Sequence, residues 1–176
     1  GQGGHPLVAC IRVAGEREGK PELECSGAAI FSDNRLVGYL DENQTLACQL
    51  IRGEPVHASL YLNQSGTSVE IERKKTQVQR STEGAVVFVG LDVSVTGKKN
   101  ILDTEEILRE TQTEVKQLMQ STINQVQQQY GMDLFKIGSA LQESGQNTIT
   151  WEQNFASFPV SVQVSAQLKN AGQTLQ

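Results

Sequence analysis

One long amphipathic helix constrains the fold of this chain more than any other feature. From residue 104 to about 130, apolar residues or threonines recur three or four positions apart, so they lie along one stripe of a helix. Asp103 suits an N-cap, Glu106 would complete a capping box, and Gly131 is a typical C-terminal stop. We therefore expect one uninterrupted helix that packs on a sheet. Its stripe consists of positions 107, 108, 111, 115, 118, 119, 122, 126 and 130.

Strand patterns on both sides of this helix supply the sheet. The segment 84–97 is apolar on both faces in its first half, which predicts a central strand, and we expect it to pair with 160–169. The fold class is therefore α+β: an antiparallel-rich mixed β-sheet with one long helix packed on a face and several short helices. Short helices are predicted near 133–143 and 149–159. The predicted strands are 6–15, 23–31, 35–40, 56–62, 67–79, 84–97 and 160–169.

The stretch "SGAAIFSDNRLVGYLDENQT", residues 26–45, predicts a hairpin followed by a helix. Ser, Asp and Asn at 32–34 have turn chemistry, because their side chains bond the local backbone and tolerate left-handed conformations. Asp41 with Gln44 forms the pattern of a capping box, and Gly53 would end the helix. Residues 16–22, "EREGKPE", are expected to be a polar connection between the first two strands.

Composition bounds the class of protein. The chain has 176 residues, 38% of them hydrophobic, which suits one globular domain. A net charge of −5 argues against nucleic acid as a partner, because phosphate binding needs a basic face. We expect a linker or tag remnant at 1–5, a single domain at 6–172 and a tail at 173–176, in a chain that is a fragment of a longer protein. Cys10 follows "LVA" but lacks a leader, so a buried strand cysteine is favoured over a lipid acceptor.

The sequence shows no catalytic or metal-binding signature. His5 and His57 have no carboxylate or cysteine at ligand spacing, and no nucleophile-elbow, P-loop or dinucleotide pattern occurs. The acidic pairs 41–42 and 105–106 lie where helix N-termini favour negative charge. We therefore predict no catalytic, cofactor-binding or metal residues and no cofactor.

The order and spacing of several blocks resemble the Ger(x)C family, the GerAC-type spore germination lipoproteins, in their C-terminal domain. The family typically shows a G-x-A-V-F strand, a polar turn, L-V-G-W-L followed by an acidic cap, then a long helix and an F-x-A-D-I-F-G-x-G segment. Tyr39 stands where the family usually has Trp. The matching residues are Gly27, Ala29, Phe31, Leu36, Val37, Gly38, Tyr39, Leu40, Asp41, Thr45, Gly53, Asp133, Phe135, Gly138, Trp151, Phe158, Pro159 and Gly172.

The resemblance implies a non-catalytic subunit domain of a spore nutrient germinant receptor, which supports receptor assembly and germination. Implied partners are the A and B membrane subunits and, through an N-terminal lipid anchor outside this fragment, the extracytoplasmic face of the inner spore membrane. Within the motif we expect Gly38 to allow close backbone approach, Leu36, Val37 and Tyr39 to pack in the core, and Asp41 to cap a helix.

Two surfaces are candidates for binding proteins: exposed sheet edges and the outer face of the long helix. Seven glutamines between 112 and 129 lie mostly off its apolar stripe, so this face is polar and nearly uncharged. A different class of function stays open, an exported small-ligand or cell-wall-binding module. An enzyme is the least favoured alternative, because it would require titratable groups that converge in a pocket.

Overall fold

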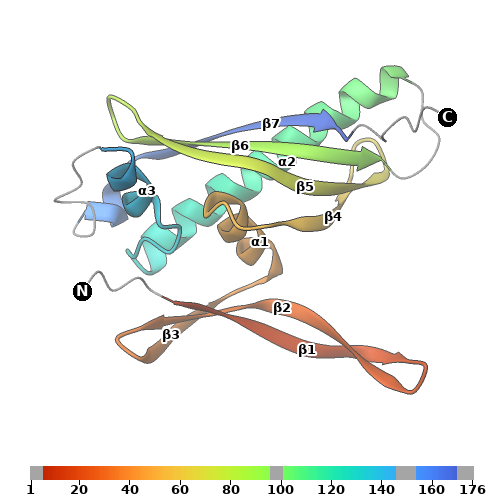
Figure 1. Ribbon diagram of the computed structural model, residues 1–176, viewed down its shortest axis with the longest axis horizontal. Helices are drawn as coiled ribbons and strands as arrows, with labels where there is room; N and C mark the ends of the chain where they lie inside the picture. Colours follow the sequence, from red (N-terminus) through yellow and green to blue (C-terminus); the bar gives the residue numbers. More distant parts are fainter. Residues whose placement is uncertain (1–5, 96–100, 146–153, 170–176) are drawn as a thin grey trace.

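The structure is a computed structural model that describes residues 6–95, 101–145 and 154–169. It contains two separate sheets, a long helix behind the larger sheet, and a short helix between the two sheets (Figure 1). The expected linker at 1–5, the expected tail at 173–176 and the motif residues Trp151 and Gly172 lie outside the described residues.

The larger sheet, sheet B, is built from β4 (His57–Leu62), β5 (Thr67–Arg80), β6 (Ala85–Val95) and β7 (Val160–Leu168), in that order. The β4–β5 and β5–β6 pairs are antiparallel, and β6 pairs with β7 in parallel. The predicted pairing of these last two strands is confirmed, and so is the central position of β6. Parallel neighbours need a long crossover connection, and here α2 is its longest element.

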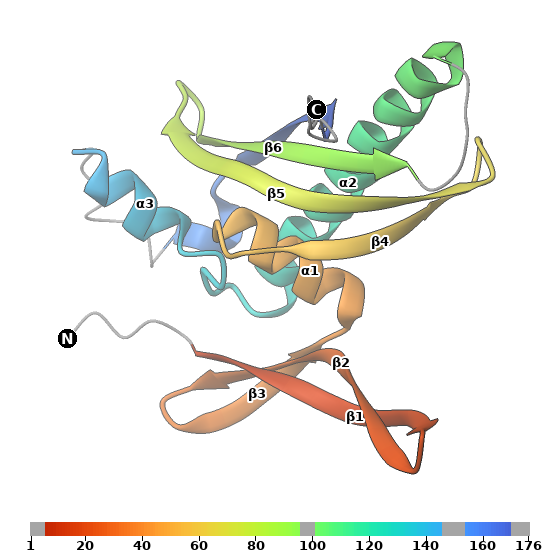
Figure 2. The same ribbon diagram turned by 45° about the vertical axis from the view of Figure 1, so that its right-hand side comes forward.

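The long helix α2 (Ile101–Gln129) covers the inner face of sheet B (Figure 2). Its buried side chains follow the predicted stripe, with Ile123 and Glu110 as additions. The predicted N-cap is wrong, because the helix begins at Ile101 and Asp103 lies inside its first turn. The predicted stop is confirmed: Gly131 has a φ of 64°, and its amide donates to the Val126 carbonyl. The stripe residues that are buried are Ile107, Thr111, Val115, Met119, Thr122 and Val126.

The smaller sheet, sheet A, consists of β1 (Leu7–Arg17), β2 (Lys20–Ser32) and β3 (Arg35–Leu40), all antiparallel. The predicted polar connection at 16–22 is wrong, because β1 and β2 extend into it and leave a two-residue turn of Glu18 and Gly19. Both turn residues have positive φ, as do Asp33 and Asn34 in the predicted "SDN" turn. Such turns match the twist of the strands that they join.

The short helix α1 (Glu42–Ile51) joins sheet A to the body. Its predicted capping box is present: the Asp41 carboxylate accepts from the Gln44 amide, and the Gln44 side chain accepts from the Asp41 amide. Gly53, with a φ of 70°, follows the C-cap as predicted. α1 contacts β2, α2 and the inner face of sheet B, so one continuous core extends from Ile30 and Leu40 into sheet B.

Two short elements close one end of the molecule, α3 (Ile137–Glu143) and the 3-10 turn η1 (Phe155–Ser157). The Asp133 carboxylate accepts from the amides of Phe135, Ile137 and Gly138, which holds the start of α3. The predicted helix at 133–143 is therefore shorter than expected. Of the predicted helix at 149–159, η1 is described and 149–153 lie outside the described residues. The α+β fold class is confirmed, and the division into two sheets is a feature that the sequence did not predict.

Candidate interaction surfaces

A charged cluster lies on the outer face of sheet B, where the β4–β5 register places His57 opposite Glu72. His57 Nδ1 lies 3.1 Å from the Glu72 carboxylate, and its Nε2 lies 3.4 Å from that of Glu70. Lys169, just after β7, donates to Glu72 at 2.6 Å. Glu70 and Glu72 are 13 and 15 residues from His57 in the sequence, so local spacing gave no sign of the cross-strand contacts.

This cluster is a set of surface ion pairs. The hydrogen bond from Lys169, with a further one from His57, lowers the pKa of Glu72. The two nitrogens of His57 contact different carboxylates, so these side chains do not converge on a single point. Among the residues that the structure describes, no group of three or more His, Cys, Asp or Glu side chains is arranged to hold a metal ion.

Cys48 lies in the core between α1 and its neighbours. Burial raises the pKa of its thiol to about 12, so the thiolate that a nucleophile or metal ligand requires is strongly disfavoured. Cys10 is half-buried in β1 and has a free thiol. The strand location predicted for Cys10 is confirmed, although its side chain is less buried than expected.

Two shallow grooves mark the surface. One, of about 330 Å³, lies between the β5–β6 turn, α2 and the start of β7, and includes Glu83, Asn124 and Phe158. The other, of about 240 Å³, lies between α1 and the edge strand β4 and includes Leu46, Gln49 and His57. Sites for small ligands commonly enclose about 300–1,000 Å³ and bury polar groups that orient the ligand. The first groove reaches the lower end of that range.

Two glycines of the opening hairpin are required by close packing. Gly27 has a φ of 124°, and a Cβ there would lie 2.1 Å from the Leu40 carbonyl oxygen. At Gly38 a Cβ would lie 2.3 Å from the hydroxyl oxygen of Tyr130, the residue that follows α2. The predicted role of Gly38 in close approach is therefore confirmed. The two glycines let sheet A lie directly against α1 and the end of α2.

The apolar residues around Gly38 are exposed, so their predicted role in core packing is wrong. Leu36, Val37 and Tyr39 are 48%, 42% and 62% exposed. Leu40 faces inward and is buried, whereas Tyr39 next to it faces outward. A register shift between Ile30 and Phe31 leaves Val37 as an extra residue in β3, so Leu36 and Val37 are both exposed although they are adjacent. The register places Val8 and Tyr39 on either side of Ala29, and Leu36 opposite Phe31. We call Val8, Phe31, Leu36, Val37 and Tyr39 the β3 patch.

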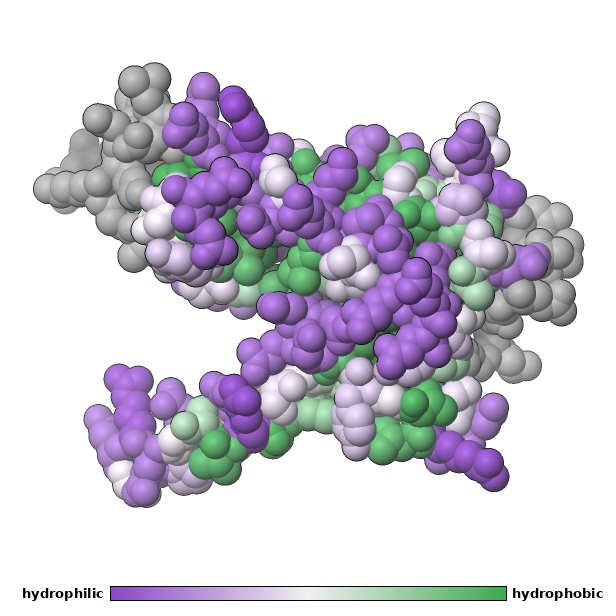
Figure 3. Space-filling view, turned by 180° about the vertical axis from the view of Figure 1, so that it is seen from behind, coloured by the Kyte–Doolittle hydropathy of each residue, from purple (hydrophilic) through white to green (hydrophobic). Residues whose placement is uncertain are grey.

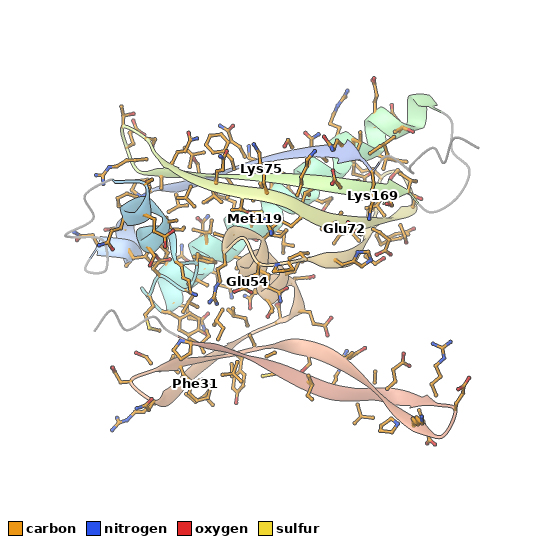
Figure 4. All side chains as sticks on the ribbon, viewed as in Figure 1. Phe31, Glu54, Glu72, Lys75, Met119 and Lys169 are labelled. Atoms are coloured by element: carbon orange, nitrogen blue, oxygen red, sulfur yellow. The ribbon has the colours of Figure 1, made fainter. Side chains whose placement is uncertain are left out.

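The β3 patch lies on the side of sheet A that faces away from the body. Figure 4 shows Phe31 on that side, while Met119 and Glu54 lie in or near the body. From behind, apolar side chains gather along sheet A, and a hollow separates its far end from the body (Figure 3). Contiguous exposed apolar residues of this kind mark interaction sites more often than single exposed ones do.

Family and structure comparisons identify the domain. The family described as "Spore germination B3/ GerAC like, C-terminal" matches residues 26–172. The chain belongs to this family. A solved structure, titled "Crystal Structure of the GerBC protein", matches with a TM-score of 0.66 at 14% identity. That match covers 93% of this chain and 57% of the GerBC chain, so the chain spans little more than half the length of that relative. The search of curated proteins finds no match.

The structure assigns physical roles to the motif residues of this GerAC-like domain. Gly27 and Gly38 allow close packing, Asp41 and Asp133 hold helix starts, and Leu36, Val37 and Tyr39 are displayed on the surface. No helix within the described ranges is both long and apolar enough to cross a membrane. Among the motif residues that the structure describes, Leu36, Val37 and Tyr39 stand out because they are exposed and have no evident packing role.

The glutamines of α2 divide into two groups. Gln127 donates to the carbonyls of Phe155 and Phe158, and Gln120 donates to that of Val160, so these two attach α2 to η1 and to the start of β7. Gln117 and Gln128 are exposed. The polar outer face that the sequence predicts is thus present, with part of its glutamine content used for internal contacts.

Proposed function

We propose that this chain is a non-catalytic domain of a germinant receptor C subunit, which supports assembly of the receptor and spore germination. Membership of the GerAC-like family over residues 26–172 carries this proposal. Its partners would be the A and B membrane subunits. A lipid on an N-terminal cysteine outside these residues would anchor the protein to the extracytoplasmic face of the inner spore membrane.

The β3 patch is the surface that we assign to a partner subunit. It combines aliphatic side chains with an exposed tyrosine, and aromatic residues are enriched at protein interfaces. It also lies on a rigid support, because Gly38 is packed against Tyr130 behind it. The outer face of α2, with Gln117 and Gln128, is the second candidate. This face is polar, so association there would bury less apolar surface than association at the β3 patch.

Co-purification of the full-length protein with its A and B subunits tests the proposal. We expect a variant with Leu36→Ser and Tyr39→Ser to lose the partner subunits, and spores that carry it to germinate slowly. The Gln117→Lys, Gln128→Lys variant is the matched control, since it alters a second exposed face of the same domain. Normal assembly of the Leu36→Ser, Tyr39→Ser variant with the A and B subunits would show that the β3 patch is not the interface. Loss of assembly by the control alone would assign the interface to α2.

An exported small-ligand or cell-wall-binding module is the alternative that the groove beside Asn124 and Phe158 favours. Chemical-shift perturbation by amino acids, sugars and glycan fragments distinguishes the two functions. A ligand of this module would perturb resonances of residues 81–85 and 156–161 and leave those of β3 unchanged. The receptor proposal predicts no saturable shifts at the groove with these compounds.

A further inference from the structure

The far half of the β1–β2 hairpin is a two-stranded ribbon. β3 pairs with β2 only from Ala28 to Ser32, so the segments on either side of the Glu18–Gly19 turn are paired only with each other. Two strands alone are marginally stable in water, and three or more strands or a packed helix are usually needed. Ile11 and Val13 in this ribbon are 66% and 64% exposed, which is unusual for β-branched strand residues.

β1 is also an edge strand. In the order β1-β2-β3, its outer side faces no other strand of the described chain. It has 11 residues and begins with the uncharged run "LVACI". Natural proteins protect such edges with short strands, charges or covering elements, because a long apolar edge pairs with other chains. The edge of β1 lacks this protection over its first half.

The ribbon is held in a defined direction. Arg12 forms ion pairs with Glu24 on β2 and, at 3.3 Å, with Glu42 at the start of α1. Beyond this contact the ribbon extends from the body, and the hollow visible in Figure 3 separates the two. A fixed direction and an unpaired outer edge leave room for a further element beside β1.

The family match indicates what that element is. The match with the family begins at Ser26, inside β2, so β1 and the first residues of β2 lie outside the matched C-terminal family domain. The match with GerBC covers 93% of the chain, so only about 12 of the 176 residues are unmatched. The segment 7–25 is longer than that, so at least part of the ribbon is matched in GerBC. The GerBC chain continues well beyond the matched part. The ribbon thus belongs to the boundary between this domain and a further region.

We propose that a region of the same full-length polypeptide, outside these 176 residues, adds a β-strand to the free edge of β1 and covers Ile11 and Val13. The added strand has alternating apolar residues, because it must continue a sheet with one apolar row. Sheet A is then shared between two regions of one protein. This arrangement does not rest on the function proposed above, because it concerns the backbone edge of β1 and the side chains of Ile11 and Val13, although Val8 of the β3 patch lies on the same strand.

Cysteine labelling compares the full-length protein with the 176-residue chain. Single cysteines replace Ile11 or Val13 in a background with Cys10→Ser and Cys25→Ser, where the remaining Cys48 is buried. We expect labelling at both sites to be roughly tenfold slower or more in the full-length protein, because a covered site reacts only when it opens locally. Ser59→Cys, on the exposed outer face of sheet B, is the control and should label equally in both proteins.

Equal labelling rates at Ile11 and Val13 in the two proteins would overturn the proposal. Protection in the 176-residue chain that increases with its concentration would assign the edge to a second copy and overturn it as well. Protection that appears only after the A and B subunits are added would assign it to a partner protein, with the same consequence. Failure of the receptor proposal would leave all of these rates unaffected.

A charge substitution gives an independent readout. Val13→Lys should leave the urea midpoint of the 176-residue chain almost unchanged, because the side chain is exposed there, and should lower that of the full-length protein. Tyr61→Lys on β4 is a matched control, since Tyr61 is also 64% exposed. It should be neutral in both proteins. Equal effects of the two substitutions in the full-length protein would contradict the proposed burial of Val13.

Discussion

Sheet A is antiparallel throughout and sheet B adds a parallel strand, β7, to its antiparallel hairpins, yet among the described elements only sheet B has a long helix across its face. α2 covers the inner side of sheet B and buries Val87, Val89 and Leu91 from its central strand. Sheet A meets the body near α1, through Ala28, Ile30 and Leu40, and at Tyr130 behind Gly38, and leaves several apolar residues of its three strands exposed. Most of the buried core is therefore associated with sheet B, and sheet A carries more exposed apolar surface.

The exposed faces differ in the same way. The outer face of sheet B carries the ion pairs of His57, Glu70, Glu72 and Lys169, which suit contact with water. The outer face of sheet A carries the β3 patch. A face selected for water and a face selected for a partner have different compositions, because a buried charge is costly and an exposed apolar cluster promotes association. This difference supports our proposal that sheet A contacts a partner.

The strongest test of this division truncates the same residue type in each part. Ile123→Ala on α2 removes fully buried atoms and should lower the free energy of unfolding by about 2–5 kcal/mol. Ile11→Ala in the ribbon should change it by less than about 0.5 kcal/mol in the 176-residue chain. Urea unfolding followed by circular dichroism measures both. Similar losses for the two variants would show that the ribbon is part of the stable core.

Backbone packing at the root of sheet A should have the next largest effect. Gly27→Ala places a Cβ against the Leu40 carbonyl in a left-handed backbone conformation, so we expect a loss of about 1–3 kcal/mol. Gly38→Ala meets the Tyr130 side chain, which can move, so its loss should be smaller. Adding Tyr130→Leu should restore stability to the Gly38→Ala variant and not to Gly27→Ala. If Tyr130→Leu does not restore stability, contact with Tyr130 is not the reason that position 38 requires glycine.

The turn of sheet B is held by a buried carboxylate, in contrast to the free turn of the ribbon. Glu110 on α2 accepts from the amides of Gln64 and Ser65 and from the Ser65 hydroxyl. Glu110→Ala should lower the free energy of unfolding by about 1–3 kcal/mol, because these donors lose their acceptor. It should also speed hydrogen exchange at 63–66. Glu106→Ala, exposed on the same helix, is the control and should leave that exchange unchanged.

The surface ion pairs of sheet B should give the smallest effect. The pKa of Glu72 is lowered in the folded protein, so its contribution is present above the ordinary glutamate pKa and is lost as pH falls through the lowered value. Wild-type stability should therefore fall slightly more than that of Glu72→Gln between neutral pH and about pH 3. The difference should shrink in high salt, because exposed pairs are screened. Glu83→Gln, in the exposed β5–β6 turn, should behave like the wild type.

Local patterns predicted the elements whose causes are local. The capping box at Asp41, the stops at Gly53 and Gly131, the stripe of α2 and the alternating strands all follow from spacing alone. The pairing of β6 with β7 followed from the length of the two strands and their complementary patterns. The GerAC-like family could also be identified from the sequence, because its motif is a series of short segments in a fixed order along the chain.

Other features depended on residues distant in sequence. The end of β1 and the start of β2 are charged and irregular, so periodicity did not identify them as strands. The partners of His57 come from β5, and Glu110 is buried because a turn 45 residues away needs an acceptor. The spacing of these residues along the chain does not predict the contacts of His57 or of Glu110.

The sequence by itself determined most of the segments that become helices and strands, because capping, turn chemistry and apolar periodicity act between near neighbours. Only the tertiary structure decided which apolar faces are covered. "LVGYL" has the same alternation whether or not a helix lies over it, and α2 covers sheet B and not sheet A. Burial depends on what the rest of the chain places against a face, and for that reason Leu36, Val37 and Tyr39 lie at the surface.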